Sequence, residues 1–232
     1  MAVRAALPER YDRHPSTLFA DAIRAELRPG ISILDVGSGR SPALAPDARP
    51  PDCDYAGLDV SRAELELAPA GSYAEHIVAD VTAPVAALRE RFDLIVSLQV
   101  LEHVPDTARA LANMREYLVP GGRLVALLSG RFSVFGVINS AIPARLGVLA
   151  MKHLLRRDPD SVFPAYYDCC HAAALHELLA PWRHADVIPI YQGGAYFNFA
   201  LPLRAAYFTY ENWAARGGHA NLATHYLLVC KR

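Results

Sequence analysis

Short apolar runs alternate with helical stretches through the first half of the chain, and this alternation constrains the fold more than any other feature. The runs are rich in Val, Ile and Leu and are apolar on both sides: ISILDVG, YAGLDVS, HIVADV, FDLIVSL and GRLVALLS. Strands of this kind belong to parallel sheets that are covered by helices on both faces. We therefore predict a doubly wound α/β fold with a Rossmann-like sheet.

The stretches between and after these runs predict the remaining elements. PSTLFADAIRAEL has an apolar helical face and ends at Pro29–Gly30. DTARALANMREYLVPGG is predicted to form a helix that closes on Gly121–Gly122. Towards the end of the chain, LHELLAPW is typical of a helix, whereas ADVIPIY and THYLLVCKR are typical of strands.

The composition favours a single domain over residues 1–232 and excludes several classes of function. The chain is 53% hydrophobic and 20% charged, which is unlike a disordered protein. Lys and Arg (23) nearly balance Asp and Glu (24), so no excess of positive charge is present to hold a nucleic acid.

Localisation and metal content follow from the termini and the cysteines. The four cysteines have no metal-ligand spacing, so we expect reduced thiols and no metal. The start of the chain, MAVRAALPERYDRHP, lacks the apolar run of a signal peptide, and no segment offers about twenty uncharged apolar residues. These features predict a cytoplasmic protein.

The segment ILDVGSGRSP turns from a strand into a glycine loop. Gly37 and Gly39 let the backbone take positive φ and approach a ligand closely. A pyrophosphate loop would continue into a long helix, but the prolines that follow limit any helix here to a turn or two. Asp35, just before the first glycine, would repel phosphate and attract an ammonium group. The loop therefore predicts a cationic or zwitterionic ligand.

Two further acids end the next two runs. Asp59 ends YAGLDVS, where a carboxylate can accept both hydroxyls of a ribose. Asp80 ends HIVADVT, where it can accept from an exocyclic amino group such as that of adenine. Each acid alone could equally be a helix cap or a solvated turn residue. Three acids at successive strand ends favour a ligand with an amine, a ribose and an adenine but no phosphate, which is S-adenosylmethionine.

In these motifs and those that follow them, the chain resembles the class I S-adenosylmethionine-dependent methyltransferases that act on small molecules. The resemblance lies in ILDVGSGRSPAL, YAGLDVS, VADVTAP, FDLIVSLQVLEHVPD and LVPGGRLVALLSG, which cover roughly residues 31–130. It implies a seven-stranded sheet with an antiparallel last strand, which ADVIPIY and THYLLVCKR would complete as strands six and seven. It also implies S-adenosylmethionine as methyl donor, S-adenosylhomocysteine as product and no metal.

The resemblance also implies which residues contact the cofactor. They are Asp35, Gly37, Ser38 and Gly39 at the methionine end, Asp59 and Val60 at the ribose and adenine, Asp80 and Val81 at the adenine edge, and Ser97, Leu98 and Gln99 near the sulfonium. Tyr11, in the segment RYD, is similar to a tyrosine that closes over the cofactor in related enzymes. Ser41 departs from the pattern, because many members have a third glycine there.

Methyl transfer is an in-line displacement that discharges a sulfonium. The protein therefore contributes mainly positioning and a site from which water is excluded, and little acid–base chemistry. A general base is needed only if the acceptor must lose a proton. His103, in LEHV, is the candidate because imidazole titrates near neutrality. A purely supporting role for His103 is the alternative.

Candidates on the substrate side come from the segment around YYDCCH. Tyr166 and Tyr167 precede a predicted helix, in a region where family members often contact substrate, and they are equally suited to packing. Asp168 is predicted to cap that helix and to place His171 in its first turn. The two cysteines between them are expected to pack rather than to bind metal.

Two segments lie outside the shared motifs and could form a substrate-side cap. The apolar insertion at about 131–165 carries cations at helical spacing over about 132–157, which predicts a helix that lies on an anionic membrane or covers a lipophilic pocket. Packing on the domain or on a second copy in a homodimer is the alternative. The segment at about 193–216 is dense in aromatic residues that could wall an apolar or planar acceptor, or could belong to the core.

These features together predict an S-adenosylmethionine-dependent methyltransferase for a small, lipophilic or aromatic acceptor, cytoplasmic or membrane-associated. Two alternatives stay open. A non-catalytic protein of the same fold would bind the cofactor or a partner without turnover. A nicotinamide oxidoreductase would be stabilised by NAD rather than by S-adenosylhomocysteine.

Overall fold

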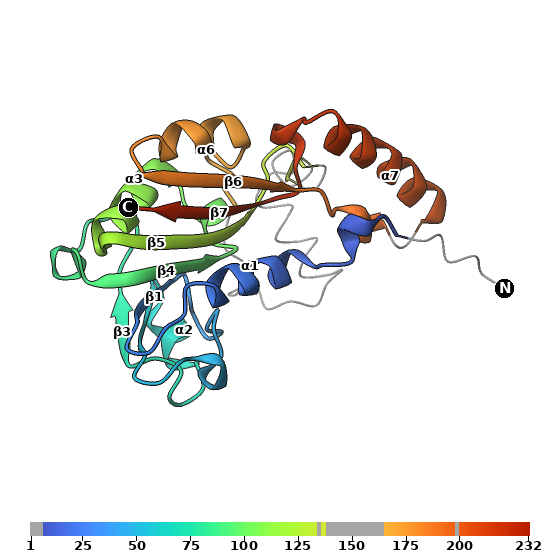
Figure 1. Ribbon diagram of the computed structural model, residues 1–232. Coiled ribbons are helices and arrows are strands. Elements are labelled where there is room, and N and C mark those ends of the chain that lie inside the picture. The colour runs from blue at the N-terminus through green and yellow to red at the C-terminus, as the bar shows by residue number, and fades with distance from the viewer. Residues whose placement is uncertain (1–6, 134–135, 138–164, 198–199) are drawn as a thin grey trace.

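The computed structural model describes residues 7–133, 136–137, 165–197 and 200–232, so most of the insertion predicted at 131–165 lies outside the described residues. The sheet has seven strands in the order β3-β2-β1-β4-β5-β7-β6 (Figure 1). Their bounds are β1 Ser32–Val36, β2 Asp54–Asp59, β3 Glu75–Val78, β4 Phe92–Leu98, β5 Leu118–Ser129, β6 His184–Ile190 and β7 His225–Lys231. Strands β1 to β5 are parallel, and β7 runs antiparallel to both β5 and β6. The predicted fold is therefore confirmed.

The strand order reverses at β1, which pairs with β2 on one side and with β4 on the other. In doubly wound sheets, ligands bind beyond the carboxyl ends of the strands at such a switch point. The glycine loop leaves β1 at this point. The fold thus directs the search for a site to the ends of β1, β2 and β4.

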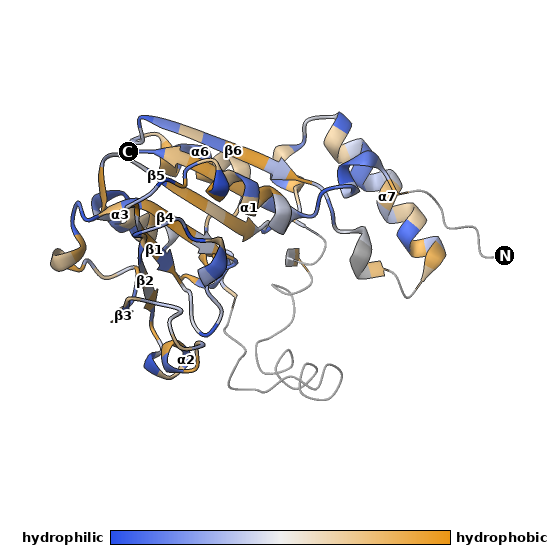
Figure 2. Ribbon diagram, turned by 60° about the horizontal axis from the view of Figure 1, so that its bottom comes forward, coloured by the Kyte–Doolittle hydropathy of each residue, from blue (hydrophilic) through white to orange (hydrophobic). Residues whose placement is uncertain are grey.

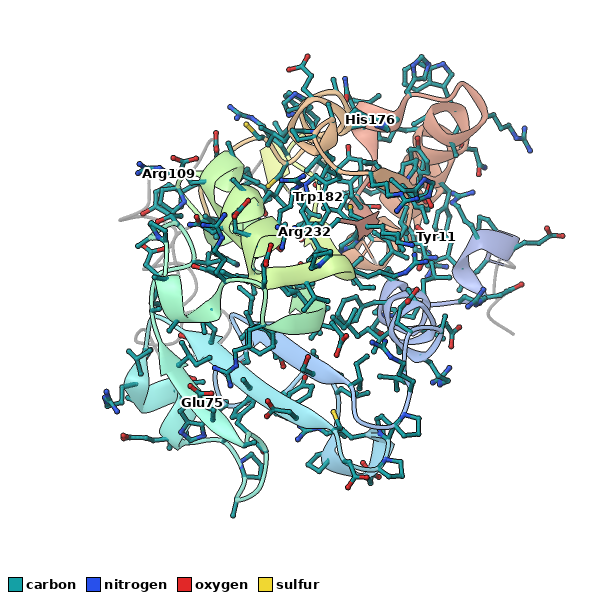
Figure 3. The ribbon with its side chains drawn as sticks, turned by 60° about the vertical axis from the view of Figure 1, so that its left-hand side comes forward. Tyr11, Glu75, Arg109, His176, Trp182 and Arg232 are labelled. Atoms are coloured by element: carbon teal, nitrogen blue, oxygen red, sulfur yellow. The ribbon has the colours of Figure 1, made fainter. Side chains whose placement is uncertain are left out.

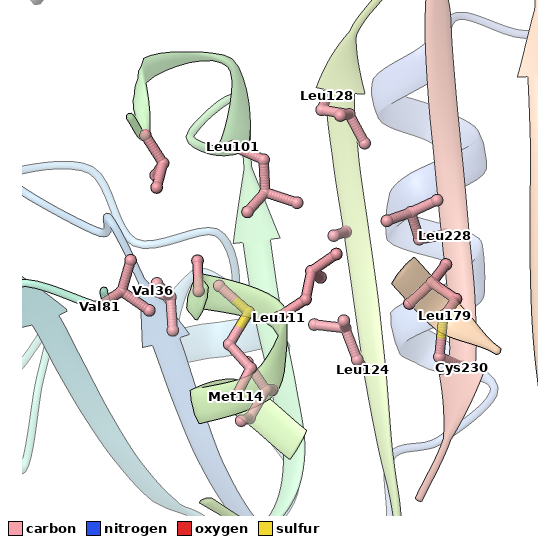
Figure 4. Packing of buried hydrophobic residues seen from close by; sticks show 14 of the residues in the cluster. Val36, Val81, Leu101, Leu111, Met114, Leu124, Leu128, Leu179, Leu228 and Cys230 are labelled. Atoms are coloured by element: carbon pink, nitrogen blue, oxygen red, sulfur yellow. The ribbon is translucent and has the colours of Figure 1, made fainter. Parts of the chain in front are cut away.

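Helices cover both faces of the sheet, and each face has its own apolar cluster. On one face, α1 (Pro15–Arg24) and α2 (Arg62–Glu66) bury Phe19, Ile23 and Leu65 against the strands. On the other face, α3 (Thr107–Tyr117) and α6 (Ala172–Leu179) cover the cluster shown in Figure 4. The central strands are mostly coloured as hydrophobic in Figure 2, as expected for strands buried on both faces.

Helix α3 ends four residues earlier than the sequence predicts. Leu118 already pairs with Phe92 of β4, so the segment LVPGG belongs to the start of β5 rather than to the helix. Pro120 lacks the N–H that would continue a helix, and Gly121 takes a φ of 83°. The proline therefore marks the change from helix to strand.

The predicted cap of α6 is also wrong. His171, not Asp168, is the residue that precedes the first turn of α6. The Asp168 carboxylate instead accepts a hydrogen bond from the backbone N–H of Thr107, at 3.1 Å, and the Asp168 carbonyl accepts from the Thr107 hydroxyl at 2.6 Å. Asp168 therefore ties its segment to the start of α3.

The aromatic-rich segment lies beyond the end of β6 and contains η6 (Gly194–Phe197) and α7 (Leu201–Arg216). Figure 1 shows α7 projecting from the sheet, close to η1 (Glu9–Tyr11) near the start of the chain. In register, Ile190 of β6 and Ser129 of β5 both pair with His225, so this segment leaves the sheet at the edge where β5 ends. None of the helices described is both long enough and apolar enough to cross a bilayer.

Candidate functional site

The glycine loop folds back over the end of β2. The Gly37 N–H donates to the Leu58 carbonyl at 2.7 Å, and Gly37 has a φ of 71°. A Cβ at this position would lie 2.3 Å from a methyl carbon of Val100, so only glycine fits. The Tyr73 hydroxyl donates to the Gly39 carbonyl at 3.0 Å. The loop is thereby held between the ends of three strands.

Asp59 is the last residue of β2, and its carboxylate is hydrogen-bonded to the glycine loop. One carboxylate oxygen accepts from the Gly39 N–H at 3.0 Å, and the other accepts from the Ser61 N–H at 2.9 Å. Burial is the main cause that raises the pKa of Asp59. Because a carboxylate oxygen has two lone pairs, both oxygens can still accept a further hydrogen bond, as from two ribose hydroxyls.

Asp35 is buried at 1% exposure and does not open to solvent. Its carboxylate accepts from the Tyr55 hydroxyl and from the Ala43 N–H, each at 2.7 Å. Burial raises the pKa of Asp35 to about 7, although both hydrogen bonds lower it. Asp35 therefore anchors the segment after the glycine loop, and its contact with the methionine end stays a prediction.

Two predicted cofactor residues carry buried polar atoms without a partner among the described residues. The hydroxyls of Ser38 and Ser97 are both buried and accept or donate no hydrogen bond there. Buried polar atoms of this kind are rare unless a ligand or water completes them. They lie at the ends of β1 and β4, on either side of the switch point. These groups fit the methionine end of the predicted cofactor.

The residues predicted at the adenine differ in exposure. The side chain of Val60 is 58% exposed beside Asp59, where it could contact an adenine ring, whereas Val81 is buried in the core. The Asp80 carboxylate accepts from the N–H and the hydroxyl of Thr82, both at 2.8 Å. Asp59 and Val60 thus lie at the glycine loop, while Asp80 sits in a turn after β3.

The end of β4 is strained. Gln99, which directly follows Leu98, has a φ of 56° although it is not a glycine. Its side-chain oxygen accepts from the Ser129 hydroxyl at 2.6 Å, which links the ends of β4 and β5. Backbone strain of this kind persists only where the surroundings impose it, and it clusters at functional sites.

Glu102 is a buried acid that the sequence did not single out. It is 3% exposed, one carboxylate oxygen accepts from the Ser129 N–H at 3.3 Å, and the other has no partner in the described part of the chain. Burial is the main cause that raises the pKa of Glu102. The only signal in the sequence was an acid in the stretch VLEHV, directly before His103.

The predicted substrate-side tyrosines attach to the same short helix, η4 (Leu101–His103). The N–H groups of Tyr166 and Tyr167 donate to the Glu102 carbonyl at 2.8 and 3.0 Å. Tyr166 is 52% exposed, whereas Tyr167 is buried with a φ of 50°. The structure therefore ties the backbone of both tyrosines to the helix that contains His103, with Tyr167 in the core and Tyr166 exposed.

His171 and the neighbouring cysteines are packed beside this segment. The His171 ring makes an edge-on contact with Phe132, with centroids 5.2 Å apart. Cys170 is fully buried, and burial raises the pKa of its thiol. Within the described ranges, no three His, Cys, Asp or Glu residues gather closely enough to hold a metal ion.

Tyr11 lies against α7 rather than against the glycine loop. Its hydroxyl donates to the Glu211 carboxylate at 2.7 Å and accepts from the Gly194 N–H at 2.8 Å. Figure 3 shows Tyr11 far from Glu75 of the edge strand β3, beside the C-terminal ribbon. Contact between Tyr11 and the cofactor stays a prediction. Glu211, which organises this region, was not recognised in the sequence.

The aromatic residues of the segment at 193–216 pack along α7. Tyr207 lies with its ring centroid 4.7 Å from that of Phe197 and 5.8 Å from that of Tyr210, and Tyr210 lies 6.0 Å from Trp213. Tyr207 is buried, whereas Trp213 is 55% exposed. The rings thus form a continuous row from the end of β6 to the surface.

Comparison with known proteins identifies a methyltransferase domain. Residues 5–185 match a family model described as a methyltransferase domain. The chain is 28% identical over 158 residues to a ubiquinone biosynthesis O-methyltransferase of Nitrobacter winogradskyi, an alignment that covers 66% of this chain and 54% of that protein. The chain therefore spans about half the length of this relative.

Solved structures with the same fold include proteins whose names give different activities. A phosphoethanolamine N-methyltransferase 2 of Haemonchus contortus, in complex with S-adenosyl-L-methionine, superposes with a TM-score of 0.56 at 11% identity, covering 93% of this chain and 52% of that one. The [4+2]-cyclase SpnF superposes with a TM-score of 0.56 at 16% identity, covering 94% and 80%. At these identities the likeness concerns the fold alone.

Proposed function

Since the chain belongs to the class I S-adenosylmethionine-dependent methyltransferase family, we propose that it transfers a methyl group from this cofactor to a hydroxyl of a small, lipophilic aromatic acceptor. The observation that carries the cofactor part is the position of Asp59. It ends β2 beside the switch point, holds the Gly39 N–H, and keeps lone pairs for two ribose hydroxyls.

When bound, the cofactor supplies an electrophilic methyl group on a sulfonium. The residues of the chain bind and orient it. Asp59 accepts the ribose hydroxyls, the exposed face of Val60 contacts the adenine, and the hydroxyls of Ser38 and Ser97 complete their hydrogen bonds at the methionine end. The contacts of Asp80 and Val81 with the adenine edge, and of Tyr11 with the cofactor, stay predictions.

The acceptor part is supported by two observations. The relatives that match the sequence are named for an O-methyl transfer in ubiquinone biosynthesis, so an aromatic hydroxyl is the simplest acceptor. The row of rings from Phe197 to Trp213 runs along η6 and α7, the segment that follows the end of β6, and could flank an apolar ring. The proposal includes the prediction that the segment at about 193–216 forms part of a cap on the substrate side of the domain.

The test uses the purified full chain with S-adenosylmethionine and 3,4-dihydroxybenzoate, a soluble aromatic with two adjacent hydroxyls. Formation of S-adenosylhomocysteine and of a methoxy product is the expected result. Binding of S-adenosylhomocysteine without turnover of this or larger phenols would favour the non-catalytic alternative. Thermal stabilisation by NAD but not by S-adenosylhomocysteine would overturn the proposal altogether.

Membrane contact is a second, separable part of the proposal. The cations predicted at helical spacing over 132–157 lie outside the described residues, so the support is the sequence pattern alone. The expected result is binding of the full chain to anionic liposomes at low salt, and release at high salt. If the chain does not sediment with such liposomes, membrane contact is contradicted.

A homodimer is tested in the same preparation by light scattering.

A further inference from the structure

The face of the sheet that α1 covers changes from apolar to polar at the end of β5. Leu127 and Leu227 lie directly opposite each other on β5 and β7, in the apolar cluster beneath α1. Ser129 and His225 form the next pair on that face, because residues two apart on a strand share a face. A polar pair thus follows the leucine pair at the carboxyl edge.

Gln99 extends this pair to a third strand. Its side-chain oxygen accepts from the Ser129 hydroxyl at 2.6 Å, so polar side chains continue from the end of β4 across β5 to β7. Gln99 is also the strained residue at the end of β4. The resemblance places the cofactor sulfonium at Ser97 to Gln99, so the row leads away from the predicted position of the methyl group.

His225 is the one ionisable member of this row. Its Nδ1 atom is buried and has no hydrogen-bond partner among the described residues. Burial, together with the smaller effect of the charge of His14, the residue that caps α1, lowers the pKa of His225 to about 4. At neutral pH the ring is therefore uncharged and has a nitrogen that can accept a proton.

Among the described residues, no carboxylate pairs with this imidazole. Directly opposite His225 are Ser129 on β5 and Ile190 on β6, and within the described part of the chain His14 is the charged group that shifts its pKa. A buried Nδ1 atom without a partner costs free energy, because the atom loses its hydrogen bond to water and gains no other. That cost suggests a partner that binds during the reaction.

We propose that Gln99, Ser129 and His225 form the acceptor subsite, with His225 as general base for a phenolic hydroxyl. The inference rests on the proposed function. In the step, the acceptor oxygen bonds to the methyl carbon as the carbon–sulfur bond breaks. The electron pair of the broken bond stays on sulfur. The hydroxyl proton moves to the imidazole of His225, which later releases it to water. Gln99 and Ser129 hold the acceptor oxygen in line.

The experiment compares histidine variants of the full chain with S-adenosylmethionine and 3,4-dihydroxybenzoate. His225→Asn is expected to lower kcat by about 10²–10⁴-fold, the usual contribution of a general base, and to leave the affinity for S-adenosylhomocysteine unchanged in calorimetry. His184→Asn is the matched control, because His184 lies at the opposite end of β6 and is exposed. His103→Asn is expected to have the smaller effect. The inference is overturned if His225→Asn keeps the wild-type kcat, or if His184→Asn loses as much kcat as His225→Asn. In either case, turnover by the wild type still upholds the proposed function.

A second measurement does not depend on turnover and observes the wild-type protein, with a variant used only to assign one signal. In the wild-type complex with S-adenosylhomocysteine, adding 3,4-dihydroxybenzoate is expected to shift the imidazole carbon-bound proton signal of His225 in NMR spectra. The signal is assigned with His225→Gln, whose folding is verified by binding of S-adenosylhomocysteine. A His225 signal that stays in place, while signals of other residues shift, overturns the subsite.

Discussion

The Tyr11 hydroxyl donates a 2.7 Å hydrogen bond to the Glu211 carboxylate, although 200 positions separate the two residues in the chain. The same carboxylate pairs with Arg10 at 2.7 Å and accepts from the Gly193 N–H at 2.7 Å. Glu211 is 2% exposed, so these groups replace the water that it loses. The segment before α1, the turn after β6 and helix α7 are thereby joined into one unit.

Removal of the Glu211 carboxylate is expected to weaken this unit. Glu211→Ala leaves the partly buried Arg10 without its carboxylate partner, although Asn212 and the Tyr191 carbonyl still accept from it, and the expected loss in unfolding free energy is about 3 kcal/mol. Glu211→Gln keeps acceptors for Tyr11 and Gly193 and should lose less. Denaturant unfolding measures both, with the exposed Glu177→Ala on α6 as control. Equal stability of Glu211→Ala and the control would contradict the role of Glu211.

Asp35 predicts a dependence of stability on pH. Because burial raises its pKa from 3.8 to about 7, the folded state favours the protonated form, and stability falls as the pH rises from about 4 to about 7 and levels off above that. Asp35→Asn cannot ionise and keeps an oxygen for Tyr55 and Ala43. The wild type should therefore lose a few kcal/mol relative to the variant between about pH 4 and 7. Parallel stability curves in urea titrations over this range would refute the expectation.

Asp59→Ala tests the ribose position. Loss of a charged acceptor for two hydroxyls is expected to raise the dissociation constant for S-adenosylhomocysteine at least about tenfold, because hydrogen bonds to charged groups contribute about 1.5–3 kcal/mol. Calorimetry measures the affinity. Asp54→Ala, at the start of the same strand, is the control. Unchanged affinity in a folded Asp59→Ala protein would show that the ribose lies elsewhere.

Glu102→Gln is expected to stabilise the protein above the pH at which an ordinary glutamate ionises. Burial raises the pKa of Glu102, so ionisation costs stability as the pH rises above the ordinary range, whereas glutamine stays neutral and can still accept from the Ser129 N–H. The stability of the variant relative to the wild type should therefore increase as the pH rises. Thermal unfolding over a series of pH values measures this. A variant that is less stable throughout the series would show that the carboxylate makes an essential contact.

The parts of the fold that depend on local pattern were predictable. The seven strands follow from short apolar runs, and Asp59 was found because it directly follows such a run. The end of α3 was misplaced because Leu118 pairs with Phe92, which is a contact between strands and leaves no mark on helical periodicity. Asp168 was misassigned for the same reason, since its partner Thr107 is 61 positions away.

The candidate site shows the same limit. Asp35 and Asp59 belong to motifs that can be read locally, but the sequence does not show that Tyr55 would take one of the Asp35 lone pairs. Glu211 and His225 carry no motif at all. Their significance comes from burial and from partners far away in the chain, which only the folded sheet brings together.

The strand order has a consequence for how the chain is made. Strand β6 leaves the ribosome before β7, yet in the described sheet it pairs only with β7, which lies between β5 and β6. During synthesis, β1 to β5 can assemble as soon as they emerge, while β6 has an unpaired edge on both sides until β7 arrives. Since unpaired strand edges invite association with other chains, β6 marks the interval in which a nascent copy is most exposed to misassembly.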